Sequence, residues 1–148
     1  MDYSRRDLGF LLSALTVTNA ATTVATKAAA MSAALPSKTS QYDDLPVTAN
    51  GPNRARAILK GETHAGFPIE LHETELAPGE QPHPPHHHVH EEMVLVREGT
   101  LEVTIGGRSA NLGAGSVAYV ASNEEHGWRN VGAARARYFV FALGRDDA

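Results

Sequence analysis

Residues 83–92 hold the densest group of potential ligand side chains in the chain, in the order His83-Pro84-Pro85-His86-His87-His88-Val89-His90-Glu91-Glu92. The turn-forming pair Pro78-Gly79 precedes this run, Gly99 follows it, and another histidine, His126, comes farther along. Imidazole nitrogens and carboxylates are good ligands for divalent transition metals. The run therefore predicts one bound metal ion rather than a solvated loop.

The spacing of the histidines fits a shared ion. Successive side chains on a strand point to opposite faces, so His86 and His88 would share one face while His87 points away. A turn through residues 89–91 would return the chain. Glu92 would then begin the neighbouring strand beside the two imidazoles.

The same alternation assigns faces in the two stretches that follow. After Glu92, the inward positions are Val94 and Val96, and Arg97 points outward. In the later stretch, the residues that share the parity of His126 are Trp128 and Asn130. We therefore predict Trp128 and Asn130 as possible pocket residues, although packing in the core would explain the indole equally well.

Other histidines and carboxylates in the run leave alternatives open. His90 shares parity with His86 and His88 if no turn intervenes, which makes it the first substitute ligand. Glu91 is the less favoured carboxylate, and His83 and His87 suit surface or supporting positions. A flexible His cluster that binds metals adventitiously is the alternative to a built site.

Short alternating runs at hairpin spacing dominate the rest of the chain. They are Ala55–Lys60, Phe67–Leu76, the His run, Glu92–Arg97, Leu101–Ile105, Arg108–Leu112, Ser116–Val120, His126–Val131 and Arg135–Leu143. Gly106-Gly107 is a two-residue hairpin turn. No long run after residue 34 has helical periodicity, so the pattern predicts an all-β barrel or sandwich.

Several of these residues coincide with a known pair of motifs. Glycine, His-x-His, glutamate and a closing glycine occur in order at Gly79, His86, His88, Glu92 and Gly99. This pattern resembles the first motif of the cupin superfamily, in its small, single-domain, metal-binding type 2 form. The residues that resemble the second motif are Gly115, Tyr119, His126 and Asn130, but Ala121 and Asn123 stand where that motif usually has Pro and Gly.

The resemblance implies a fold and a ligand set. The fold would be a single-domain, jelly-roll-like antiparallel β-barrel over residues 54–148, preceded by a linker or edge segment at 35–53. The implied metal ligands are His86, His88, Glu92 and His126. The ion would be one divalent Fe, Mn, Ni, Cu, Co or Zn, since these ligands do not choose among them.

The first 34 residues predict an export signal. Ser4-Arg5-Arg6-Asp7-Leu8 opens an uncharged stretch that extends to Thr26 and leads to three consecutive alanines, Ala28 to Ala30. This resembles a twin-arginine signal peptide, with cleavage near Ala30 or Ala34. The protein would then pass through the twin-arginine translocon to the periplasm or outside the cell. An uncleaved anchor helix is the alternative.

The amino-acid composition narrows the range of binding partners and ligand types expected for the chain. The chain of 148 residues has a formal net charge of −4 and no cysteine. After residue 30 it has ten basic and fifteen acidic residues, so nucleic acid is not an expected partner. Disulfides and thiolate ligands are excluded. A small-molecule substrate or ligand is expected, and a homodimer is possible.

The leading functional hypothesis is an exported metal-dependent oxidoreductase of the dioxygenase type, as the cupin resemblance implies. Four protein ligands would leave positions on a six-coordinate ion for substrate and dioxygen. Glu92 could alternatively act as a general base, and the candidates for a further acid or base in an isomerase or lyase are Tyr119, Tyr138 and His83. Two other classes stay open: a non-catalytic cupin that binds a sugar or other small molecule through a static metal, and a metal-dependent isomerase or lyase.

Overall fold

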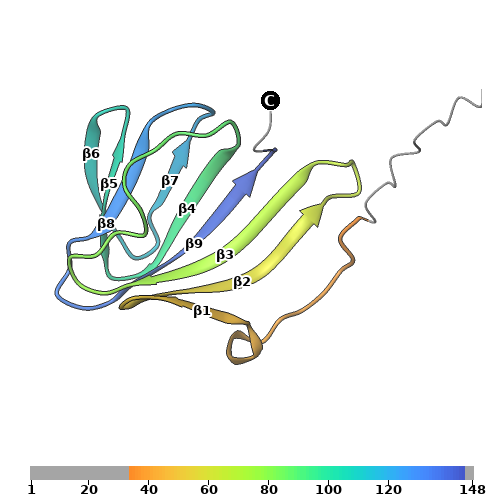
Figure 1. Cartoon of the computed structure of the whole chain (residues 1–148), viewed down its shortest axis with the longest axis horizontal. Coiled ribbons are helices and arrows are strands. Elements are labelled where there is room, and N and C mark those ends of the chain that lie inside the picture. Colours follow the sequence, from red (N-terminus) through yellow and green to blue (C-terminus); the bar gives the residue numbers. More distant parts are fainter. Residues whose placement is uncertain (1–33, 146–148) are drawn as a thin grey trace, which may run out of the picture. The chain divides into compact units, whose positions relative to one another are not determined.

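The computed structural model of the chain describes residues 34–145 (Figure 1). The twin-arginine pair Arg5-Arg6 and the cleavage position Ala30 lie outside the described residues, so the export signal stays a prediction. Within residues 34–145, no helix has the length and apolar character needed to cross a membrane.

The described residues form one short 3₁₀ turn and nine strands in two antiparallel sheets (Figure 1). The elements are η1 Tyr42–Asp44, β1 Val47–Asn50, β2 Asn53–Glu62, β3 Pro68–Leu76, β4 Glu91–Glu98, β5 Thr100–Ile105, β6 Arg108–Gly113, β7 Val117–Val120, β8 His126–Asn130 and β9 Ala136–Leu143. The larger sheet has the order β1-β2-β3-β9-β4-β7, and the smaller has the order β6-β5-β8. The all-β, jelly-roll-like prediction is confirmed.

Most strand predictions agree with the structure to within two or three residues, but the His run is not a strand. Residues 83–90 make one isolated bridge, in which His86 and His126 exchange backbone N–H···O bonds of 3.0 and 2.9 Å. Pro84 and Pro85 have no N–H to donate, so a continuous ladder cannot form there. The prediction of a strand through this run is therefore wrong.

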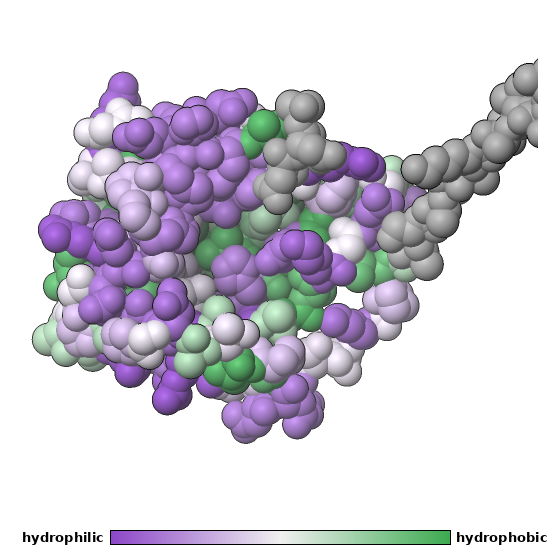
Figure 2. All heavy atoms as spheres, viewed as in Figure 1, coloured by the Kyte–Doolittle hydropathy of each residue, from purple (hydrophilic) through white to green (hydrophobic). Residues whose placement is uncertain are grey.

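The hydrophobic core lies between the two sheets and follows the predicted alternation. Val94 and Val96 are 0% and 1% exposed, whereas Arg97 lies on the outer face. The other core residues are Leu76, Leu101, Val103, Ala118, Trp128, Ala136, Tyr138 and Val140. In Figure 2, hydrophobic residues lie in a recess near the centre of the face in view, between hydrophilic margins. Burial of this apolar face fixes the register of each strand.

Cation–π contacts join the N-terminal described segment to the outer face of the larger sheet. The guanidinium groups of Arg56 and Arg97 lie over the Tyr42 ring, at 4.5 and 4.8 Å from its centroid. Those arginines donate to two buried carboxylates, Glu75 and Glu73, at 2.9 Å each. The contacts offset the cost of burying the charges. The segment predicted as a linker or edge segment, residues 35–53, contains η1 and the edge strand β1.

Gly99, the closing glycine of the first motif, is required by its surroundings. Its φ is +81°, and a Cβ there would lie 2.7 Å from the Ala136 Cα and 2.9 Å from the Arg135 carbonyl oxygen. We expect Gly99→Ala to lower the free energy of unfolding by about 3 kcal/mol, from backbone strain and overpacking combined. Urea denaturation of the purified variants measures this.

Gly107 offers a matched control in the next hairpin. It also has a positive φ, +76°, but a Cβ there would meet no atom of the described residues within 4 Å. Gly107→Ala should therefore cost only the backbone term, about 1 kcal/mol. Equal losses in the two variants would show that the contact with residues 135–136 is not what requires the glycine.

Candidate metal centre

Three histidines meet at one end of the core. His86 and His88 come from the loop between β3 and β4, and His126 begins β8, where the backbone bridge to His86 holds the two segments together. Each imidazole offers a ring nitrogen, and these nitrogens all lie within 4.8 Å of one another. His126 is 1% exposed. The predicted cluster of His86, His88 and His126 is thus present in the fold.

Glu92 approaches two of these imidazoles, His88 and His126, from β4 of the larger sheet. Its Oε1 lies 3.5 Å from His88 Nε2, and its Oε2 lies 3.4 Å from His126 Nε2. β4 belongs to the six-stranded sheet and β8 to the three-stranded sheet. The carboxylate therefore approaches His126 across the core. A strand does begin beside Glu92, as predicted, but the His run bridges to His126 and not to β4, so the predicted pairing with a neighbouring strand is wrong.

Backbone carbonyls fix the tautomers of two of the imidazoles. His88 Nδ1–H donates to the His90 carbonyl oxygen and His126 Nδ1–H donates to the Glu124 carbonyl oxygen, both at 2.8 Å. Each Nε2 is then an acceptor whose lone pair points toward the cluster. Second-shell hydrogen bonds of this kind orient metal-binding histidines.

The inward atoms have no donor to satisfy them. Among the described residues, the buried Nε2 atoms of His88 and His126 and Oε2 of Glu92 lack a hydrogen-bond partner. Acceptors that face one another at 3.4–3.5 Å repel unless a cation lies between them. The residues present therefore fit a divalent metal ion held by nitrogen and oxygen.

His86 is also suited to the neutral form that a metal requires. Burial lowers its pKa, and the neighbouring imidazoles His83, His126 and His88 lower it further, while Glu92 acts in the opposite direction. A neutral imidazole keeps a lone pair for an ion.

The remaining histidines of the run differ in position. His83 and His87 are exposed, although the His83 ring lies against His86 with centroids 4.2 Å apart. His90 stacks on His88, and its Nε2 lies 3.4 Å from Glu92 Oε1. His88, His90 and Glu92 thus form a second group with ligand atoms in mutual reach.

A cavity of about 240 Å³ adjoins the cluster and includes Glu92 in its wall. Trp128 lines it and donates from Nε1 to the Tyr138 hydroxyl oxygen at 2.8 Å, and burial raises the pKa of Tyr138, which keeps that hydroxyl protonated. His72 and Thr74 add polar groups to the same wall. The structure thus places Trp128 in the predicted pocket.

Sequence reasoning missed His72 and Thr74. Both share the parity of the buried Leu76 on β3, and this parity could have indicated that they point inward. It could not indicate that they lie near Glu92, because that depends on the pairing of β3 and β4 with β9. Burial lowers the pKa of His72, while the nearby Glu70 carboxylate opposes the shift. A neutral imidazole that can accept a proton is therefore available in the cavity.

Two predicted residues lie elsewhere. Tyr119 is 57% exposed and pairs with Met93 on the outer face of the sheet, one residue out of phase with Glu92. Asn130 is fully buried, but its amide donates to the carbonyl oxygens of Leu76 and Ala134, at 3.1 and 2.8 Å, and so holds the loop after β8. The structure therefore brings neither the phenol of Tyr119 nor the amide of Asn130 into the pocket.

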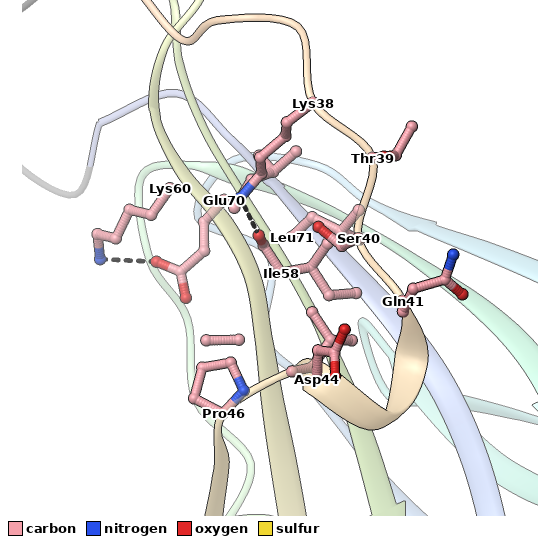
Figure 3. A pocket seen from close by; sticks show the side chains of 13 residues that line it. Lys38, Thr39, Ser40, Gln41, Asp44, Pro46, Ile58, Lys60, Glu70 and Leu71 are labelled. Atoms are coloured by element: carbon pink, nitrogen blue, oxygen red, sulfur yellow. Dashed lines mark hydrogen bonds and ion pairs between the residues drawn. The ribbon is translucent and has the colours of Figure 1, made fainter.

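A larger cavity, of about 570 Å³, lies apart from these histidines (Figure 3). Lys38 to Gln41 border one side, and Ile58, Glu70 and Leu71 border the other. Lys38 Nζ donates to the Ile58 carbonyl oxygen at 2.7 Å and closes part of the gap. None of the candidate ligands lines this cavity, so size alone does not identify the functional site.

Comparison with known proteins agrees with this fold. Residues 72–142 match the family model described as Cupin domain, and the chain belongs to the cupin superfamily. No curated protein matches it.

Solved structures with similar folds include proteins described in different ways. An RmlC-like cupin from Shewanella frigidimarina is 18% identical, with a TM-score of 0.62, over 76% of this chain and 95% of that chain. The polyketide cyclase RemF from Streptomyces resistomycificus is 22% identical, with a TM-score of 0.64, over 76% and 83%. A predicted oxalate decarboxylase from Thermotoga maritima is 14% identical, with a TM-score of 0.62, over 73% and 100%. At these identities the likeness establishes the fold alone.

Proposed function

We propose that the protein is a metal-dependent enzyme of the dioxygenase type that acts on a small organic molecule. His86, His88, Glu92 and His126 would hold the ion. The observation that carries this proposal is that Glu92 lies within 3.5 Å of the ring nitrogens of His88 and His126 and also forms part of the wall of the 240 Å³ cavity. A molecule in the cavity would therefore lie beside the ion rather than behind a closed shell.

The cavity wall supports catalysis over a static metal. A bound divalent ion would supply Lewis acidity and, for a redox-active metal, electron exchange with dioxygen. Trp128 and Val140 give the cavity an apolar side, while Thr74 and His72 offer polar atoms to orient a substrate. Phe139 and Phe141 are on the outer face with Glu73 and Leu71, so they do not fill the space.

His72 supports a second candidate, a metal-dependent isomerase or lyase. It lines the cavity and is not part of the ligand cluster, so it could move a proton to or from a substrate while the ion polarises the substrate's oxygen. The similar structures include a polyketide cyclase and a predicted oxalate decarboxylase, which shows that the fold does not choose the reaction.

Oxygen uptake separates these candidates. The metal-free protein would be loaded separately with Fe(II), Mn(II), Ni(II), Co(II), Cu(II) or Zn(II), and tested with phenolic and diketone compounds under air and under argon. We expect oxygen consumption matched to substrate loss, with a redox-active metal only. Substrate loss that continues under argon would favour the isomerase or lyase, and stoichiometric binding without turnover would favour a binding protein.

A further inference from the structure

We propose that His90 is a positioning residue of the metal centre, which presents Glu92 Oε2 and His88 Nε2 to the ion without binding the ion itself. This inference rests on the metal site of the proposed function. It concerns two different parts of His90, its backbone carbonyl and its ring.

The backbone carbonyl of His90 determines how His88 is presented. It accepts the Nδ1–H of His88 at 2.8 Å. Because a neutral imidazole has one N–H, this contact leaves Nε2 of His88 as the acceptor. The ring of His90 then stacks on the ring of His88, with centroids 3.6 Å apart and planes 8° from parallel. Together these contacts restrict both the tautomer and the rotation of His88.

The ring of His90 also holds one of the two oxygens of Glu92. His90 Nε2 lies 3.4 Å from Oε1, at the long end of the range for a hydrogen bond, and with Nε2 protonated it donates to this oxygen. The other oxygen, Oε2, faces His126 Nε2 and has no hydrogen-bond partner among the described residues. Oε1 of Glu92 thus has a hydrogen-bond donor in His90, whereas Oε2 has none among the described residues and is available to a cation.

The parallel stacking of His90 on His88 indicates that His90 positions the ligands and does not bind the ion itself. An imidazole binds a metal through a lone pair in the plane of its ring. Since the His88 and His90 rings are nearly parallel and 3.6 Å apart, an ion in the plane of one ring lies well out of the plane of the other. The two rings cannot both bind one ion without a large rotation. The side chains of His88, His90 and Glu92 are similarly buried, at 14%, 13% and 12% exposed, so burial does not distinguish the two roles.

The test compares two substitutions at His90 with one at the exposed neighbour His87. His90→Ala removes the ring, whereas His90→Gln keeps an N–H donor at similar reach, and His87→Ala is the control. Zn(II) affinity would be measured by competition with a chelator. The Co(II) absorption spectrum would report the ligand field directly, and circular dichroism would confirm that each variant is folded.

We expect His90→Ala to weaken Zn(II) binding by about 10–100-fold while one ion per chain still binds at saturation, as for other supporting residues. The Co(II) bands should shift in that variant and return toward wild type in His90→Gln, while His87→Ala should match wild type. An unchanged affinity in His90→Ala would overturn the inference. Loss of the site in both His90 variants would overturn it in favour of a ligand role. If the wild-type protein bound no ion, the proposed function would fail along with the inference. An unchanged affinity in His90→Ala, or loss of the site in both His90 variants, would overturn the inference alone.

Discussion

His126→Ala should abolish tight stoichiometric metal binding. The substitution removes the Nε2 that lies 3.4 Å from Glu92 Oε2, and it removes the most buried imidazole of the cluster. Because loss of a supporting residue alone costs about 10–100-fold in metal affinity, loss of this ligand should cost more than about 100-fold. Isothermal titration with Zn(II) and elemental analysis of the purified variant measure the effect.

His87→Ala is the matched control for this loss. His87 lies in the same run but is exposed and is not part of either ligand group. It should keep wild-type stoichiometry and affinity. Retention of full occupancy in folded His126→Ala would remove β8 from the metal site and leave a centre built from the His run alone.

Glu92→Gln should separate catalysis from metal retention. The amide keeps the size of the side chain but removes the only negative charge within the predicted ligand set. An ion held by neutral imidazoles alone binds more weakly and has a different Lewis acidity. At metal concentrations that restore occupancy, we expect turnover to be at least about 100-fold below wild type, since the carboxylate also adjoins the cavity and can carry a proton.

Glu91→Gln tests whether charge alone is responsible. Glu91 is the adjacent carboxylate on β4, and its side chain has the opposite parity to that of Glu92. The Glu91 variant should retain both metal affinity and turnover. If occupancy and activity of Glu92→Gln fell by the same factor, the carboxylate would serve only to hold the ion.

The alternation of apolar residues was enough to predict the strands and the inward face of β4. Val94, Val96, Leu101 and Val103 are all buried, and a one-residue slip of either strand would expose its apolar residues, so the register is strongly specified. The same local rule paired His86 with His88 and separated His87 from them. His86 and His88 share a side although the run is not a continuous strand, since the single backbone bridge between His86 and His126 fixes the orientation of the chain at His86.

The errors arise where distant segments decide the environment. Tyr119 has the spacing expected from the second motif, yet its register against β4 directs it outward. Asn130 has the inward parity, but the loop that follows β8 uses its amide. His72 enters the pocket because β3 pairs with β9, a contact between residues far apart in sequence. Sequence patterns predict which face a residue occupies, but not which distant partner meets it there.

The central claim is that the Nε2 atoms of His88 and His126 face an ion with their Nδ1 protons held by backbone carbonyls. Long-range ¹H–¹⁵N NMR correlation spectra of the histidine rings, recorded with and without one equivalent of Zn(II), test this directly. We predict that both rings keep a protonated Nδ1 and that their Nε2 resonances shift to metal-bound values on addition of zinc. Unchanged Nε2 resonances, or binding through Nδ1 instead, would contradict the account.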